Sequence, residues 1–370
     1  MKETKQTTDG LGNSNSITLG PWEWLVAATI VLAVVVVVPR MGGGEFISDD
    51  ADYRIPYTLS EDYWLYDARR RTAGVGWGTP VVGDSVIWGH YVPPEATLSH
   101  YLSGGDGTFL NCGVDGIYPL AMAVLVRYYG SDLTRIEGDP VILHCDPLWL
   151  AGEVEHLHDE TKDFRLNHER LIPQLWPRVA TYKESLSDRI DVAVERWLPF
   201  RDGSRHLQLT AYGGLDLPSW AVEHPYKLPP LLPTGPAAEY GAELDTRTWR
   251  QRGMTPQDLP FIGLDESLHW RGFIEAVGVF RGRGARVFVV IGPLNEHMLT
   301  DAGRATYAAL RKAMADRLEA LGVPCFVPPV LPSDEYADLS HPLAAGYARW
   351  AEMLWADEAF TRFHGVEADE

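Results

Sequence analysis

The chain has 370 residues, of which 45% are hydrophobic and 11% aromatic, so it can bury a sizeable core and is neither disordered nor collagen-like. It carries 32 Lys and Arg against 51 Asp and Glu, a formal net charge of −19. Because such a surface repels phosphate backbones, we expect no nucleic-acid partner. The three cysteines are widely spaced, which excludes a disulfide framework and a structural zinc ribbon.

An uncharged apolar run extends from Leu25 to Val38. With its flanks it predicts an uncleaved transmembrane signal anchor over residues 21–39, preceded by a cytoplasmic tail over 1–20. A cleaved signal peptide is the alternative. Lysines precede the run and acidic residues follow it, which favours an extracytoplasmic location for the remainder. The sequence thus predicts a single-pass protein of the cell membrane, with the lipid bilayer as a partner.

Residues 40–75 are rich in Tyr and Trp and are interpreted as a juxtamembrane stalk that packs on the following domain. From 76 to 370, short apolar strands alternate with helical stretches. This pattern predicts an α/β domain with a doubly wound, mainly parallel sheet of about five strands, flanked by helices. Expected strands lie near residues 80–82, 109–110, 141–143, 287–291 and 323–327, and expected helices near 119–129, 302–321 and 342–355.

A large helical or irregular insertion is expected at about 150–285, because this stretch is too long for a single crossover connection. Its helical candidates lie at 164–182, 187–198 and 265–281. It also contains a cluster of acidic residues and histidines at 153–160. We interpret this cluster as a solvated acidic face rather than as a metal site.

Two short motifs at opposite ends of the domain carry residues suited to nucleophilic catalysis. In VVGDSVIWG, Ser85 lies in the turn after the first strand, and in DLSHP, Asp338 precedes His341 by three residues. An activated serine needs a base to accept its proton and a carboxylate to orient the imidazole. Asp334 and Glu335 are rival carboxylates, but the three-residue spacing favours Asp338. As alternatives, Ser85 is an ordinary turn residue and the histidine only precedes a helix.

In these motifs the chain resembles the SGNH/GDSL family of serine hydrolases and transferases. The resemblance implies a flavodoxin-like fold in which Ser85 is the nucleophile, His341 the general base and then acid, and Asp338 the residue that orients it. It also implies an oxyanion hole that includes the backbone N–H groups of Ser85 and Gly116. Neither a cofactor nor a metal is expected. The matching residues are Gly83-Asp84-Ser85, Asn111-x-Gly113-x-x-Gly116 and Asp338-x-x-His341.

The third motif of the family, G-x-N-D after the third strand, is absent here. That strand is followed by Asp146-Pro147-Leu148-Trp149, without an Asn, whereas Asn295 follows the fourth strand and is a candidate oxyanion donor. The D-P-L-W and G-P-L-N-E strand ends, the insertion and the anchor are similar to DltD-type and alginate-acetylation-type members. Such proteins work outside the cytoplasm with a membrane-bound O-acyltransferase that acylates cell-envelope polymers.

The resemblance implies an extracytoplasmic serine esterase that acts through an acyl-enzyme on ester-linked acyl groups, above all acetyl, of a small molecule or polysaccharide. One alternative is an O-acyltransferase or accessory protein that works with a membrane-bound O-acyltransferase on cell-envelope polysaccharide. Another is a non-catalytic binding subunit that retains the fold.

Four further residues near the motifs have open or structural interpretations. Trp88 and His90 either line the acyl pocket or pack against the helix after Ser85. Cys112 and Cys145 follow strands expected to be about 9–10 Å apart at about 4.8 Å per step, beyond disulfide reach. We therefore expect both to be buried thiols.

Overall fold

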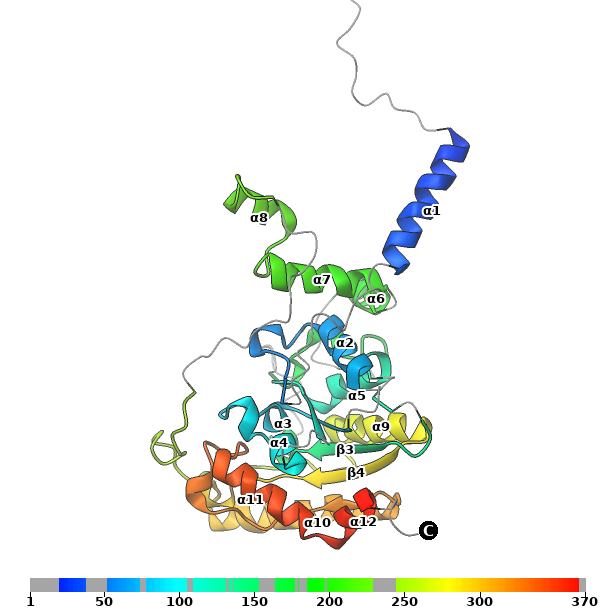
Figure 1. Cartoon of the computed structure of the whole chain (residues 1–370). Helices are drawn as coiled ribbons and strands as arrows, with labels where there is room; N and C mark the ends of the chain where they lie inside the picture. Colours follow the sequence, from blue (N-terminus) through cyan, green and yellow to red (C-terminus); the bar gives the residue numbers. More distant parts are fainter. Residues whose placement is uncertain are drawn as a thin grey trace, which may run out of the picture.

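The structure is a computed structural model of the chain, and its centre is a five-stranded parallel sheet with the order β2-β1-β3-β4-β5 (Figure 1). The strands are Thr79–Gly83 (β1), Phe109–Gly113 (β2), Pro140–Cys145 (β3), Arg286–Ile291 (β4) and Cys325–Phe326 (β5). The predicted doubly wound α/β sheet is therefore confirmed. The residues that the structure describes are 20–37, 52–73, 78–104, 109–130, 133–134, 136–152, 164–176, 179, 185–196, 198–228 and 244–365.

Helices cover both faces of the sheet, because successive strand residues point to opposite sides. Val141 and Leu143 pack in one hydrophobic cluster with α5 and α9, whereas Ile142 packs in the other with α11 and α12. The helices are Pro21–Val37 (α1), Tyr63–Ala73 (α2), Ser85–Trp88 (α3), Leu98–Ser103 (α4), Pro119–Tyr128 (α5), Leu186–Glu195 (α6), Pro199–Ala211 (α7), Leu217–Glu223 (α8), Leu268–Gly282 (α9), Asp301–Ala320 (α10), Ala344–Trp355 (α11) and Glu358–Gly365 (α12).

Most of the expected helices are present within a few residues of their predicted ends, but the one predicted at 164–182 is wrong. Its described part contains only two short 3-10 turns, Phe164–Leu166 and Glu169–Leu171. His168 between them has a φ of 63°, a left-handed conformation that ends a helix. Pro173 follows and cannot donate a backbone hydrogen bond, so the helical pattern of apolar residues is overridden.

The aromatic residues that precede β1 belong to the main core. Tyr63, Trp64 and Tyr66 on α2 are buried and join the cluster that covers one face of the sheet. Arg54 donates to the carbonyls of Trp88 and Gly89 at 2.8 and 2.6 Å, and its guanidinium lies 3.8 Å from the centroid of the Trp88 ring. This segment therefore fixes the end of α3.

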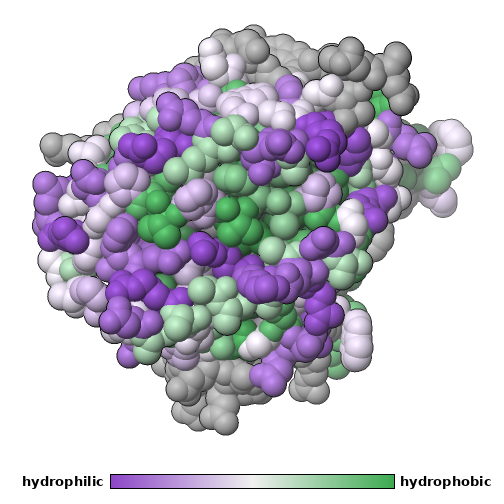
Figure 2. Space-filling model, turned by 90° about the horizontal axis from the view of Figure 1, so that it is seen from below, coloured by the Kyte–Doolittle hydropathy of each residue, from purple (hydrophilic) through white to green (hydrophobic). Residues whose placement is uncertain are grey.

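The N-terminal apolar segment forms α1, which has 17 residues. Among the residues that the structure describes, no helix is both long and apolar enough to cross a membrane. In Figure 1, α1 lies at the same end of the molecule as α6, α7 and α8, away from the helices α10 to α12. Figure 2 views the face of α10 to α12, where hydrophilic and hydrophobic residues are intermixed.

Candidate active site

The turn that carries Ser85 is held by its neighbours on both sides. Asp84 caps α3, since its Oδ1 accepts a hydrogen bond from the Val86 N–H at 3.0 Å. Gly83 is required before it, because a Cβ there would overlap Ile87 and His144. The hydroxyl of Tyr347 on α11 donates to the carbonyl of Val86 at 2.5 Å. Ser85 is thus placed at the first position of a short helix at the carboxyl end of β1.

The second turn brings Asp338 and His341 together. The backbone N–H of Ala337 donates to the carbonyl of His341 at 2.9 Å, which closes the turn. Inside it, Asp338 Oδ1 accepts from the N–H groups of Ser340 and His341 at 3.0 and 2.9 Å. The rival Glu335 instead forms a bidentate ion pair with Arg349 on α11. The carboxylate that the turn presents to the imidazole is therefore that of Asp338.

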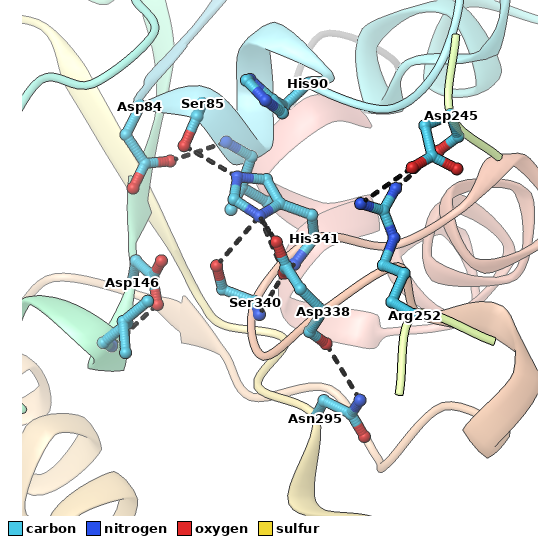
Figure 3. A network of polar contacts seen from close by, with 12 residues as sticks. Asp84, Ser85, His90, Asp146, Asp245, Arg252, Asn295, Asp338, Ser340 and His341 are labelled. Carbon is cyan, nitrogen blue, oxygen red and sulfur yellow. Dashed lines mark hydrogen bonds and ion pairs between the residues drawn. The ribbon is translucent and has the colours of Figure 1, made fainter. Parts of the chain in front are cut away.

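The structure brings the three predicted residues into one chain of hydrogen bonds (Figure 3). His341 Nε2 lies 2.8 Å from Ser85 Oγ, and His341 Nδ1 lies 2.9 Å from both carboxylate oxygens of Asp338. Because a carboxylate only accepts, Nδ1 carries a proton. In the neutral imidazole, Nε2 then has the lone pair that accepts the serine proton.

The electrostatic surroundings of these three residues favour the protonated form of the His341 imidazole. Burial lowers the pKa of His341, but Asp338, and with smaller effects Asp84 and Asp146, raise it to about 9. For Asp338, burial raises the pKa, but the charge and hydrogen bonds of His341 hold it well below its ordinary value. The pair thus stabilises the imidazolium that forms when His341 accepts the proton of Ser85.

A second carboxylate–imidazole contact lies directly behind the nucleophile. His144 Nδ1 is 3.2 Å from Asp84 Oδ1, and both side chains are buried. The other ring nitrogen, Nε2, donates to the carbonyl of Gly292 at 3.0 Å, while Trp149 Nε1 donates to Asp84 Oδ2 at 2.9 Å. Burial raises the pKa of Asp84, but the charge and contact of His144 outweigh it, so this carboxyl is ionised.

Two backbone N–H groups are available for an oxyanion. Those of Ser85 and Gly116 have no hydrogen-bond acceptor among the described residues. Gly116 has a φ of 71°, a left-handed conformation that suits Gly in the turn after β2. Asn111 orients this turn: its amide donates to the carbonyl of Ile87 and its side-chain oxygen accepts from the N–H of Gly113.

Asn295 does not occupy the oxyanion position considered from the sequence. Its side chain is fully buried, and its amide donates to the backbone carbonyl of Asp338 at 2.9 Å. In Figure 3 it lies beyond Asp338, on the side away from Ser85. The physical reason is that the Gly292-Pro293 turn after β4 packs against the turn that contains Asp338. The backbone N–H of Asn295 also donates to the carbonyl of Leu339 in that turn.

Sequence reasoning did not single out Asp146, the residue directly after β3. It is 3% exposed, and Oδ1 accepts from the N–H of Leu148 at 2.8 Å. Burial, and after it the charge of Asp84, raise its pKa to about 7. Its position in the sequence was the available signal. Asp146 directly follows a strand, and the carboxyl ends of the parallel strands form the edge of the sheet that carries Ser85.

Aromatic rings lie next to His341. The ring centroids of His90 and Tyr91 lie 5.5 and 5.4 Å from that of His341, and the guanidinium of Arg252 lies 4.2 Å from that of Tyr91. His90 Nδ1 is 2.8 Å from Asp115 Oδ1. Trp88 is instead buried and donates to the carbonyl of Ile55, so it packs α3.

Cys112 and Cys145 are both buried thiols, as predicted. Within the described ranges, no group of three His, Cys, Asp or Glu side chains could hold a metal ion. The acidic cluster at 153–160 lies outside the described residues.

The chain matches no protein-family model, and no curated protein matches it either. The SGNH/GDSL resemblance is therefore carried by the three short motifs.

Proposed function

We propose that this chain is a serine esterase of the SGNH/GDSL type, which acts on ester-linked acyl groups, above all acetyl, of a small molecule or polysaccharide. The observation that carries the proposal is the continuous contact from Ser85 Oγ through His341 to Asp338, at 2.8 and 2.9 Å. A non-catalytic binding subunit has no physical need for a base, an orienting carboxylate and a serine in hydrogen-bonding order.

In the proposed reaction, Ser85 Oγ attacks the ester carbonyl carbon while its proton moves to His341 Nε2. The carbonyl oxygen becomes an oxyanion near the N–H groups of Ser85 and Gly116. Collapse breaks the bond to the alcohol oxygen, which takes the proton from Nε2, and leaves an acyl-Ser85 ester. Water then attacks this ester, with His341 again as base, and releases the acid and free Ser85. A sugar hydroxyl in place of water makes the same intermediate an acyl donor, as in the O-acyltransferase alternative.

The proposal includes attachment of the protein to the cell membrane, with the catalytic domain on the extracytoplasmic side. Large apolar side chains are exposed on α1 and on the inserted segments at the same end of the molecule. Such a concentration of exposed apolar surface is typical of a lipid or protein contact. On α1, α6, α7 and α8 these side chains are Trp22, Trp24, Leu25, Val26, Ile30, Val31, Leu32, Leu186, Ile190, Val194, Phe200, Leu217 and Val222.

The test of the esterase proposal is covalent labelling of the full chain with a fluorophosphonate, together with hydrolysis of p-nitrophenyl acetate. We expect labelling and turnover in the wild type and neither in Ser85→Ala. Ser340→Ala is the matched control, because the Ser340 hydroxyl also lies close to His341, at 3.4 Å from Nδ1. Since Ser340 is not the predicted nucleophile, this variant is expected to keep its label. A folded wild-type protein without Ser85-dependent labelling contradicts the proposal and favours the binding subunit.

Membrane attachment is tested separately, by fractionation of cells that express the full chain. We expect it in the membrane fraction, resistant to extraction at high salt. A variant with Ile30, Val31 and Leu32 replaced by Asp is expected to become extractable. Wild-type protein that is fully extracted by salt contradicts attachment through apolar side chains.

A further inference from the structure

We propose that His168, a residue of the insertion, is a positioning residue for the reaction. Its imidazole holds the peptide bond between Asp115 and Gly116, so that the Gly116 N–H stays directed toward the oxyanion. This inference rests on the esterase proposed above, in which that N–H is a donor. Oxyanion donors stabilise charge that develops only during the reaction and act through their exact placement, so a residue that fixes one of them contributes to the rate.

The backbone of His168 has an uncommon conformation. Its φ is 63°, and among the described residues His168 is the only one other than Gly with a left-handed φ. This conformation is unfavourable for a residue with a Cβ, and it persists where the surrounding structure enforces it, above all at functional sites. The residue is 4% exposed, so the direction of its ring is set by contacts inside the protein.

Both ring nitrogens of His168 have a partner, and the partners define the tautomer. Nε2 lies 2.9 Å from the carbonyl oxygen of Asp115, and Nδ1 lies 3.0 Å from the hydroxyl of Tyr63. A carbonyl only accepts, so Nε2 carries the proton and the Tyr63 hydroxyl donates to Nδ1. Burial lowers the pKa of His168, although the Asp115 carbonyl raises it, and the ring is therefore neutral at pH 7.

The contact with Asp115 fixes the direction of the Gly116 N–H. In a planar trans peptide, the carbonyl of one residue and the N–H of the next point in opposite directions. Because the Asp115 carbonyl is turned toward His168, the Gly116 N–H is turned away from the insertion. This N–H has no acceptor among the described residues. The insertion lies close to the turn, since a Cβ on Gly116 would be 3.6 Å from Asn167 Nδ2 and 3.9 Å from His168 Nε2.

The peptide that His168 holds lies beside the reacting residues. The side chain of Asp115 is held on the other side by His90, whose Nδ1 is 2.8 Å from Asp115 Oδ1. The ring centroid of His90 is 5.5 Å from that of His341. In Figure 3, His90 and Ser85 lie on the same side of the His341 ring. The carbonyl and the carboxylate of Asp115 thus connect the insertion to the site.

The turn that carries His168 is itself fixed to the domain. The carbonyl of His168 accepts from the N–H of Leu171 at 2.7 Å, and Leu171 is fully buried in the main core. The neighbouring Arg170 donates to Asp202 on α7 at 3.0 Å. The insertion therefore supplies a rigid support for the turn that follows β2.

The experiment measures kcat and KM for p-nitrophenyl acetate in the full-length wild type, His168→Gln, His168→Asn and the control His224→Asn. The amide of Gln reaches the place of Nε2 and still donates to the Asp115 carbonyl, whereas the shorter Asn ends near the place of Nδ1. His224 is another histidine of the insertion whose ring donates to a backbone carbonyl, that of Trp220 at 3.1 Å.

His168→Asn is expected to lower kcat by about 10–10²-fold with KM within about threefold, because the Gly116 N–H is no longer held in place. His168→Gln is expected to keep kcat within about fivefold of the wild type, and His224→Asn within about twofold. A purely structural role of His168 predicts the opposite order, since Asn adopts the left-handed conformation more readily than Gln. Urea denaturation shows that the compared variants are folded.

Equal losses of kcat in His168→Asn and His168→Gln overturn the inference, as does a loss confined to KM. If His168→Asn does not fold, Tyr63→Phe decides, because it removes only the hydroxyl that selects the tautomer. It is expected to lower kcat by about twofold to tenfold at unchanged KM, and an unchanged kcat overturns the inference. Absence of Ser85-dependent turnover in the wild type is a different result, because it removes the esterase itself.

Discussion

His144 Nδ1 lies 3.2 Å from Asp84 Oδ1, and this buried pair joins the end of β3 to the residue before the nucleophile. Nε2 of the same ring donates to the carbonyl of Gly292 after β4. The carboxylate of Asp84 also caps α3 and accepts from Trp149. One pair of side chains thus connects three strand ends around Ser85.

Asp84→Asn is expected to destabilise the protein by about 3–5 kcal/mol, because the buried His144, whose pKa burial lowers but Asp84 raises, loses its ion-pair partner. The free energy of unfolding is measured by urea denaturation. In the double variant Asp84→Asn/His144→Gln, no charge remains at the pair, so the loss is expected to be clearly smaller than the sum of the two single losses. Additive losses would show that the pair is not coupled.

Asp338→Asn is expected to lower kcat by about 10⁴-fold, since an amide does not hold the imidazole in the tautomer with a free Nε2. The matched control is Asp334→Asn, because Asp334 is an exposed residue four positions before Asp338. It is expected to keep kcat within about threefold. Equal effects of the two substitutions would refute the role of Asp338.

Asn295→Ala is expected to lower stability by about 1–3 kcal/mol, because the carbonyl of Asp338 loses its donor inside the protein. Its kcat is expected to stay within about tenfold of the wild type. A loss of about 10²–10³-fold in kcat, with unchanged stability, is the result that a direct oxyanion donor gives instead. Steady-state kinetics and urea denaturation on the same preparation distinguish the two.

The triad histidine should make stability depend on pH. Its pKa is about 9 in the folded protein against an ordinary value of 6.5, so its contribution is complete below pH 6.5 and is lost as the pH rises through 9. Between pH 6 and pH 10, the difference in unfolding free energy between wild type and His341→Gln is expected to fall by about 3 kcal/mol. A constant difference would mean that the folded-state pKa of His341 is ordinary.

Several features were accessible from local pattern alone. The alternation of apolar strands and helices predicted the five parallel strands, because the spacing of apolar residues along the sequence indicates which segments are buried strands and which are helices. The turns of Ser85 and of Asp338 and His341 were equally readable, since each consists of consecutive residues with fixed spacing. The wrong prediction of a helix at 164–182 shows the limit of such patterns. There the left-handed conformation of His168 and the following Pro173 prevent a helix despite the helical spacing of apolar residues.

Only the tertiary structure decided which distant groups meet at the strand ends. Asn295 and Asp146 both follow central strands in sequence, yet one supports the turn of Asp338 and the other lies next to Ser85 across the β1–β3 pair. The contact of Asp84 with His144 joins residues 60 positions apart. The sequence by itself determined the reacting side chains, because their spacing is local, whereas the electrostatic surroundings that tune them come from folding, because charges interact through space.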